Sequence, residues 1–247
     1  MTGETTGTPG EATQKVPEFT WPDYIGWGWM IAQERMEADW KGIWNYALPH
    51  VHATEETVSN AEAQLGFRLP ESYRGFLLAS NGWPYFFQDM TAFSTSDLLG
   101  GDLHEAGQTQ LELPECVEAM AAAGVIAADH FPAAASMKSI DVALMGRPGT
   151  PAEGTVSSVR GEVIERYDDF LDYYLSMMEL SKQETESIRR KDGPSSPRRY
   201  SEAIRSSGNP VSSLTLVTNT PESVEFLGQR AREILGPDVE LHIQLKP

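Results

Sequence analysis

Residues 65–83 read L-G-F-R-L-P-E-S-Y-R-G-F-L-L-A-S-N-G-W, and they decide the fold more than any other stretch of this sequence. Gly66 is suited to end one helix in a left-handed conformation. Pro70 is suited to open the next helix, where its missing N–H costs nothing. Asn81 and Gly82 give the backbone the freedom to leave that second helix. The stretch therefore predicts a helix end, a short connector, a second helix and a sharp exit.

The residues around this stretch extend the prediction in both directions. Thr54 can cap the first helix, because its hydroxyl can accept a hydrogen bond from a free amide at the helix start. Trp83 and Tyr85 alternate with their neighbours as strand residues do. These two rings either line a groove beside the sheet and contact a partner, or are buried in the strand. Tyr73, Phe76 and Leu77 are at helical spacing and face inward. We expect the core to include Leu65, Leu69, Tyr73, Phe76 and Leu77.

The first part of the chain divides into a tail and an aromatic block. Residues 1–16 have almost nothing to bury, so we expect a disordered tail. Met36, Trp40 and Trp44 follow at helical spacing and predict a helix over residues 32–47. Burial of this helix across the main domain is favoured over an exposed aromatic platform, because such large rings are usually buried.

Further elements follow, with a weak signal over residues 93–113. We expect helices over 114–124 and 168–180, a strand over 140–145, and a hairpin of 155–159 with 162–164. Helices and strands are interleaved without a strict βαβ alternation, which favours an α+β fold over a doubly wound one.

The C-terminal part is expected to be separate from the main domain, which we place at residues 17–188. Residues 189–199 have the composition of a linker, and a solvated hinge is favoured over a phosphate contact. Residues 200–247 predict a small β-α-β appendage, with its elements at 213–217, 223–235 and 239–245. A unit of this size is too small to fold alone, so we expect it to dock on the main domain.

The charge is strongly negative and unevenly placed. The chain has a net charge of −17; residues 1–188 hold 29 acidic and 10 basic residues, and residues 189–247 hold 7 and 9. An acidic body repels nucleic acid and anionic membranes and attracts basic proteins. Cys116 is the only cysteine, so no intramolecular disulfide can form. With no apparent signal sequence or membrane span, we expect a cytoplasmic protein.

Motifs of catalysis are missing. No nucleophile elbow, P-loop or dinucleotide fingerprint follows a predicted strand, and the histidines lack the spacing of a zinc site. Asp102, His104 and Glu105 could bind a metal or act as acid and base, but an exposed loop is favoured. We therefore expect no catalytic residue, metal or cofactor. A run of acids is either a solvated face or a docking surface for a basic protein, and it comprises Asp102, Glu105, Glu112, Glu115 and Glu118.

The segment from Thr54 to Trp83 resembles the signature of the SUKH superfamily, in the branch that includes the yeast glucan-synthesis regulator. The residues that carry the resemblance are Leu65, Gly66, Leu69, Pro70, Tyr73, Phe76, Leu77, Asn81, Gly82 and Trp83. Residues 161–178 are similar to the family's closing strand and helix. The acidic, glycine-rich loop that many members carry has no obvious copy here.

The resemblance implies an α+β domain with N-terminal helices packed on a central, mostly antiparallel sheet. It also implies a non-enzymatic function. Most bacterial members are thought to be immunity proteins that bind and neutralise toxins, often nucleases, so the implied partner is a basic toxin domain. Eukaryotic members act in regulation and scaffolding, and a regulatory or scaffold protein without a toxin partner is the alternative.

Overall fold

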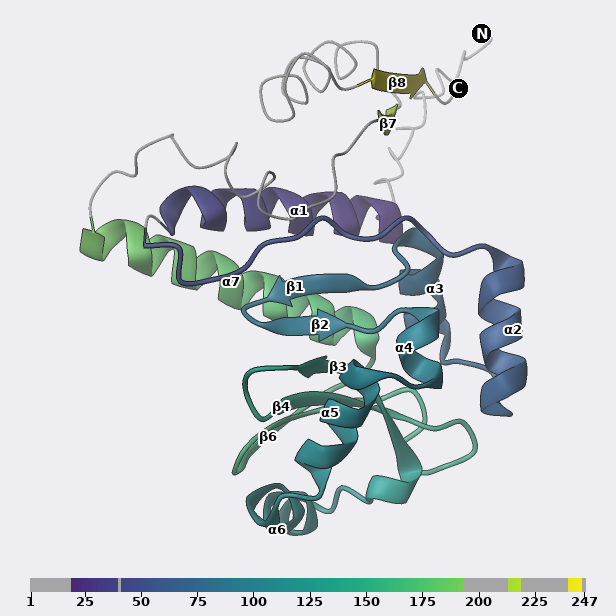
Figure 1. The fold of residues 1–247 in the computed structure, drawn as a ribbon. Coiled ribbons are helices and arrows are strands. Elements are labelled where there is room, and N and C mark those ends of the chain that lie inside the picture. The colour runs from purple at the N-terminus through teal and green to yellow at the C-terminus, as the bar shows by residue number, and fades with distance from the viewer. Residues whose placement is uncertain (1–18, 40, 193–212, 219–239, 246–247) are drawn as a thin grey trace, which may run out of the picture.

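The computed structural model describes residues 19–39, 41–192, 213–218 and 240–245 (Figure 1). The helices are α1 (Trp21–Ala38), α2 (Glu55–Leu65), α3 (Glu71–Ala79), α4 (Thr95–Leu99), α5 (Asp102–Leu111), α6 (Pro114–Ala123), the 3-10 helix η1 (Ala127–Asp129) and α7 (Phe170–Asp192). The strands are β1 (Trp83–Phe87), β2 (Met90–Ala92), β3 (His130–Ser136), β4 (Asp141–Gly146), β5 (Val156–Arg160), β6 (Val163–Tyr167), β7 (Ser213–Thr218) and β8 (Glu240–Leu245).

The fold is α+β, as the sequence predicts. Strands β1 to β6 form one sheet in sequence order, and each strand is antiparallel to the next. In Figure 1, α5 lies in front of the sheet, whereas α7 passes behind it with α1 alongside. The sheet is therefore covered on both faces, and the most buried side chains lie between it and these helices.

Residues 54–83 form the predicted pair of helices, α2 and α3. The Thr54 hydroxyl accepts the N–H of Thr57 at the start of α2, and Gly66 ends α2 with φ at +77°. Pro70 occupies the cap position of α3. The rings of Tyr73 and Phe76 are fully buried, and the Tyr73 hydroxyl donates to the carbonyl oxygen of Phe93 at 3.0 Å. Helix α3 is thus packed and hydrogen-bonded onto the chain that follows β2.

The predicted helix over residues 32–47 is wrong. Helix α1 begins eleven residues earlier, where the carboxylate of Asp23 accepts both the N–H and the hydroxyl of Thr20. It ends at Ala38 because the carboxylate of Asp39 accepts the N–H groups of Ile43 and Trp44, at 2.9 Å each. Those amides are therefore bonded to a side chain and not to helical carbonyls. Trp40 lies outside the described residues.

Residues 93–136 contain elements that the sequence did not predict. Helices α4 and α5 lie in the region of weak signal, and β3 reads H-F-P-A-A-A-S with no β-branched residue. Strand β3 forms because it lies between β2 and β4 and is buried along its whole length. Its small side chains allow α5 to approach: a Cβ on Gly107 would lie 3.4 Å from the Cβ atoms of Pro132 and Ala135. Tertiary packing overrides strand propensity here.

The last elements of the sheet confirm the predicted strand at 140–145 and the hairpin that turns at Gly161, with small differences in their bounds. Helix α7 is longer than predicted, since it continues beyond residue 180 to Asp192 and enters the expected linker. Ser181 and Thr185 are buried on this extension. The additional turns pack against α1, which the sequence pattern of α7 alone does not reveal.

The C-terminal strands β7 and β8 pair in parallel. The expected helix over 223–235, the tail over 1–16 and most of the linker lie outside the described residues, and docking of the appendage stays a prediction. No helix in the described part of the chain is long and apolar enough to cross a membrane.

Candidate functional site

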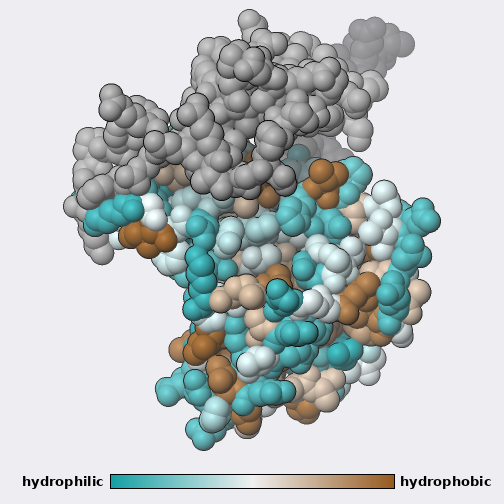
Figure 2. All heavy atoms as spheres, in the orientation of Figure 1, coloured by the Kyte–Doolittle hydropathy of each residue, from teal (hydrophilic) through white to brown (hydrophobic). Residues whose placement is uncertain are grey.

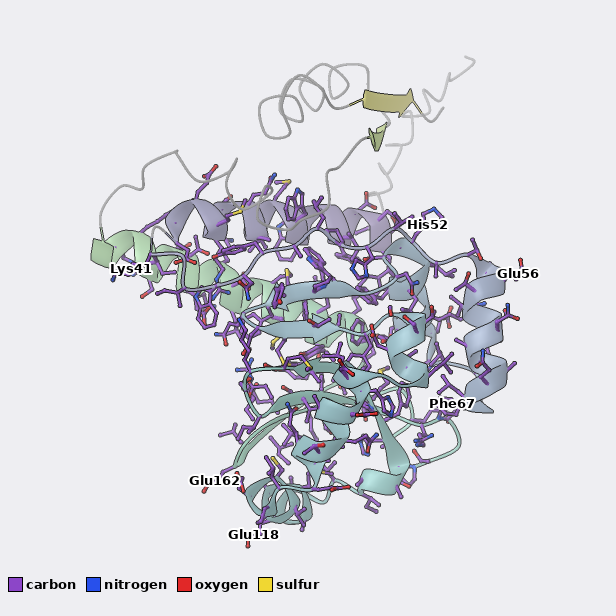
Figure 3. All side chains as sticks on the ribbon, in the orientation of Figure 1. Lys41, His52, Glu56, Phe67, Glu118 and Glu162 are labelled. Atoms are coloured by element: carbon purple, nitrogen blue, oxygen red, sulfur yellow. The ribbon has the colours of Figure 1, made fainter. Side chains whose placement is uncertain are left out.

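Helices α5 and α6 present an acidic surface. It comprises Asp102, Glu105, Glu112, Glu115 and Glu118, all five exposed, and we call it the α5–α6 acidic surface. Asp102 and Glu105 lie in the first turn of α5, so the loop expected there is wrong. Negative charge in a first helical turn is favourable, because it faces the positive end of the helix dipole. Figure 3 shows Glu118 pointing away from the sheet, at the outer side of α6.

This surface carries no compensating positive charge from its own part of the chain. Between Arg74 and Lys138 the sequence has eight acidic residues and neither lysine nor arginine. Among the ion pairs formed within the described ranges, none includes a member of the α5–α6 acidic surface. Five acids elsewhere in the described residues do form ion pairs, as Glu55 does with Arg74. Its own part of the chain therefore supplies charge of one sign, and Arg166 of β6 donates to the carbonyl oxygen of Ala123 at the end of α6.

Trp83 and Tyr85 do not extend this surface. Trp83 is 1 % exposed, and its indole N–H donates to the carbonyl oxygen of Ala47 at 3.0 Å. A partner cannot contact it, so the burial alternative holds. Tyr85 is half-buried and has φ at +56°, which breaks the strand alternation and leaves Phe86 and Phe87 both buried.

Residues 52–135 match the SMI1 / KNR4 family (SUKH-1). The match confirms the resemblance to the SUKH superfamily over these residues. The match runs from just before α2 into β3, so it includes α5 and α6 and stops before β4. The family includes immunity proteins and regulators. No curated protein sequence matches the chain. The proposed likeness of residues 161–178 to the family's closing strand and helix lies beyond the matched range and stays a prediction.

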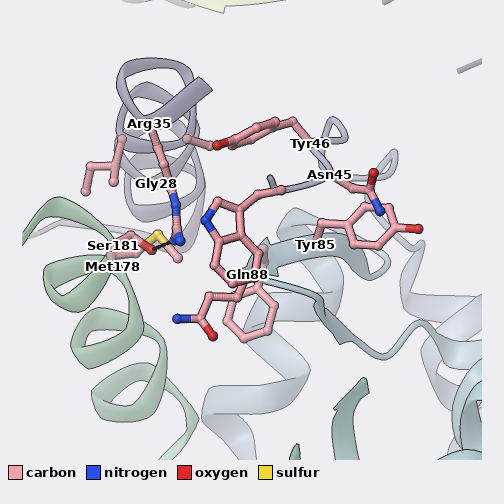
Figure 4. A pocket seen from close by; sticks show the side chains of 12 residues that line it. Gly28, Arg35, Asn45, Tyr46, Tyr85, Gln88, Met178 and Ser181 are labelled. Atoms are coloured by element: carbon pink, nitrogen blue, oxygen red, sulfur yellow. Dashed lines mark hydrogen bonds between the residues drawn. The ribbon is translucent and has the colours of Figure 1, made fainter. Parts of the chain in front are cut away.

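A second polar cluster, which the sequence did not predict, lies between α1, α7 and the segment after α1 (Figure 4). Arg35 is only 4 % exposed. Its Nη2 lies 2.6 Å from Oε2 of Glu184, and its guanidinium carbon lies 5.1 Å from the ring centre of Trp44. Gln88, with φ at +53°, donates to the other oxygen of Glu184 at 2.7 Å.

The hollow beside Arg35 is too small for a substrate. It encloses about 10 Å³ of space, which is room for one water molecule. Tyr46 closes one side, and its hydroxyl donates to the carboxylate of Asp39 at 3.3 Å. Burial, with the Asp39 charge adding to it, raises the pKa of Tyr46. The role of this cluster is therefore structural: it holds the segment after α1 against helices α1 and α7. Arg35 and Glu184 are far apart in sequence, so no spacing could have indicated it.

Asp102, His104 and Glu105 lie together in the first part of α5. Nδ1 of His104 lies 3.2 Å from the carbonyl oxygen of Asp97, at the N-terminal part of α5. Within the described ranges, no three His, Cys, Asp or Glu side chains come close enough to hold a metal ion. Cys116 is buried, and desolvation raises the pKa of its thiol, which lowers its thiolate fraction.

Proposed function

We propose that this protein is a non-enzymatic immunity protein of bacterial type, which binds and neutralises a basic toxin domain such as a nuclease. The observation that carries the proposal is the α5–α6 acidic surface, with no lysine or arginine in its 63-residue stretch between Arg74 and Lys138. Such a surface attracts a basic protein and repels nucleic acid and anionic membranes. The matched family includes immunity proteins, which also supports this proposal.

The acidic surface would act first on the rate of encounter. Uncompensated charge of one sign steers a partner of the opposite sign, and this raises the association rate most at low salt. Neutralisation then needs only that the bound domain covers the toxin's basic, substrate-binding surface. The proposal places the protein in the cytoplasm, where a buried and unpaired Cys116 would stay reduced.

The first experiment identifies the toxin. Each reading frame adjacent to the gene for this chain is expressed alone and together with it. The proposal requires one product that stops growth alone and is harmless beside this protein. If pull-downs instead recover several unrelated partners, none of them toxic, the regulatory or scaffold alternative is correct.

The second experiment locates the binding surface. The variant Glu112→Lys/Glu115→Lys/Glu118→Lys is compared with Glu37→Lys/Glu56→Lys/Glu71→Lys, in which three exposed acids on α1, α2 and α3 are reversed. Both variants change the net charge equally. Stopped-flow association with the toxin should slow by about tenfold or more only in the first variant. If association slows equally in both variants, the effect comes from the net charge, and the proposed binding surface is wrong.

A further inference from the structure

The solvent side of α1 carries a row of aromatic and apolar side chains that the domain does not fully bury. Phe19, just before the helix, is 65 % exposed, and Met30 is 57 % exposed. Tyr24 and Trp27, which lie between them in the sequence, are half-buried. We call these four residues the α1 aromatic stripe. Brown spheres lie among teal ones along the upper part of the described surface in Figure 2, at the level of α1 and the segment after it in Figure 1.

Ring distances and helical spacing make these four side chains one continuous surface. The rings of Phe19 and Tyr24 are stacked, with 5.9 Å between their centres. Trp27 follows Tyr24 by three residues, and Met30 follows Trp27 by three. Side chains at this spacing are neighbours on the surface of a helix. The stripe therefore runs without a gap from the start of α1 to its middle.

The charged groups on the solvent side of α1 are acidic, and one of them binds the last turns of α7. Asp23, Glu34 and Glu37 are the exposed acids of α1. Glu34 lies one helical turn after Met30, and its Oε2 is 3.4 Å from Nη1 of Arg189. Helix α7 ends three residues after Arg189. The chain therefore leaves α7 close to the α1 aromatic stripe.

The C-terminal unit of the chain is long enough to reach this stripe. Residues 193–212 separate the end of α7 from the start of β7, a connection of 20 residues. A chain of that length spans up to about 70 Å, whereas a helix of 18 residues, as α1 is, has a length of about 27 Å. Figure 1 shows β7 and β8 on the α1 side of the domain, away from α5 and α6.

Strands β7 and β8 form an apolar face that their own unit leaves partly open. Leu214 is paired with Leu241 and Leu216 with Ile243, and side chains paired in this way point to the same face. A sheet of two strands is about 10 Å wide, no wider than one helix. The helix expected over 223–235 can therefore cover this face, but it leaves the apolar side chains open along both edges. Because a two-stranded sheet is not stable by itself, the unit needs further burial.

We propose that the α1 aromatic stripe is the docking site for the C-terminal unit of the same chain, residues 213–245. The stripe closes one open edge of this unit, so that Phe19, Trp27 and Met30 pack against its leucine and isoleucine side chains. The basic segment 189–199 then follows the acidic side of α1, an arrangement that the pair of Arg189 with Glu34 begins. This inference is independent of the proposed toxin binding, which uses α5 and α6.

Photo-crosslinking of the full chain tests the contact directly. A benzophenone-bearing amino acid replaces Met30 in one preparation and Met137 in another; Met137 is equally exposed, at 60 %, and lies in the β3–β4 turn. After irradiation, mass spectrometry should find cross-links from position 30 to residues 213–245 in a product of monomer size, and none from position 137. If position 30 does not cross-link to residues 213–245, the proposal is wrong. A cross-linked product of dimer size would identify a second copy of the chain as the occupant and would also overturn it.

Hydrogen exchange then measures whether the stripe stabilises the C-terminal unit. Met30→Glu places a charge in the stripe and keeps a good helix former, and Met137→Glu is the matched control with the same change of charge. Amides of β7 and β8 should exchange about tenfold faster in Met30→Glu only, while those of α2 keep their rates in both variants. If the α2 amides also exchange faster in Met30→Glu, the same comparison is made with Phe19→Ser, which lies outside the helix. Unchanged exchange in β7 and β8 shows that the stripe does not hold the unit.

Discussion

Arg35 of α1 and Glu184 of α7 form an ion pair, with 2.6 Å between Nη2 and Oε2, at a point where the guanidinium is almost fully buried. The pair joins residues from opposite ends of the domain. Because Arg35 also lies against Trp44, it connects the helix pair to the segment that follows α1. This arrangement gives the first prediction.

Arg35→Met should destabilise the domain although it keeps an unbranched apolar stem. The substitution leaves Glu184 without its cationic partner, but Glu184 is 37 % exposed and can regain water. We therefore expect a loss of about 1–2 kcal/mol in the free energy of unfolding, below the range for a fully buried pair. Urea unfolding measures it. Arg190→Met removes an exposed pair with Glu186 and should change stability by less than about 0.5 kcal/mol.

Gly28→Ala should destabilise the contact between α1 and α7. A Cβ on Gly28 would lie 2.0 Å from the hydroxyl oxygen of Tyr174 and 2.9 Å from the sulfur of Met178. The hydroxyl cannot move freely, because it donates to the carbonyl oxygen of Tyr24 at 3.0 Å. We expect a loss of about 1–3 kcal/mol from overpacking.

Gly26→Ala is the control for that substitution, since it lies in the same helix with no atom within 4 Å of the added Cβ. Here alanine should stabilise the helix by about 0.5–1 kcal/mol, because glycine is the poorer helix former. Thermal unfolding of the two variants should therefore move in opposite directions. Equal shifts of the same sign would show that the close approach at Gly28 is not a constraint.

Tyr73→Phe should cost about 1–2 kcal/mol by leaving a buried carbonyl without its donor. The Tyr73 hydroxyl donates to the oxygen of Phe93 at 3.0 Å, and that residue follows β2. Because the ring stays, the loss reports the hydrogen bond and not the packing. Tyr24→Phe, at a half-buried tyrosine of α1, is the comparison for loss of a less buried hydroxyl. Chemical denaturation checks both.

Alkaline pH should unfold the domain. Burial raises the pKa values of Tyr73, Tyr173 and Tyr174 above the ordinary value of 10.0. The folded state therefore binds these protons more tightly than the unfolded state does, so their contribution to stability is fully present below about pH 10 and falls as the pH rises further. Phenolate absorbance and far-UV circular dichroism, recorded together, should change in one transition. Ionisation of all the tyrosines before any loss of helix would contradict this prediction.

Local patterns in the sequence predicted the elements whose signals are local. Thr54, Gly66 and Pro70 mark the ends of α2 and α3 through hydrogen-bonding and backbone requirements that each residue carries itself. The hairpin of β5 and β6 was likewise predicted from its turn and alternation. The acids of the α5–α6 acidic surface could be named from the sequence, but their common exposure on two helices could not.

Long-range contacts explain what the sequence left unpredicted. The alanines of β3 favour no strand by themselves, and the strand exists because β2 and β4 provide its hydrogen bonds while α5 covers it. Spacing of Trp40 and Trp44 suggested a helix, but the carboxylate of Asp39 binds the amides that such a helix would need. From the sequence, Trp83 could either contact a partner or be buried. Its hydrogen bond to the carbonyl oxygen of Ala47, far away in the sequence, shows that it is buried.

By itself, the sequence determined the helix pair around Pro70, the α+β class and the strong negative charge, because capping, glycine conformation and ionisation are properties of single residues and their near neighbours. Tertiary structure alone decided that Arg35 meets Glu184, that β3 completes the sheet, and that Phe19 and Met30 remain exposed to solvent. These relationships depend on which surfaces are buried when distant segments pack, and burial is a property of the whole folded chain.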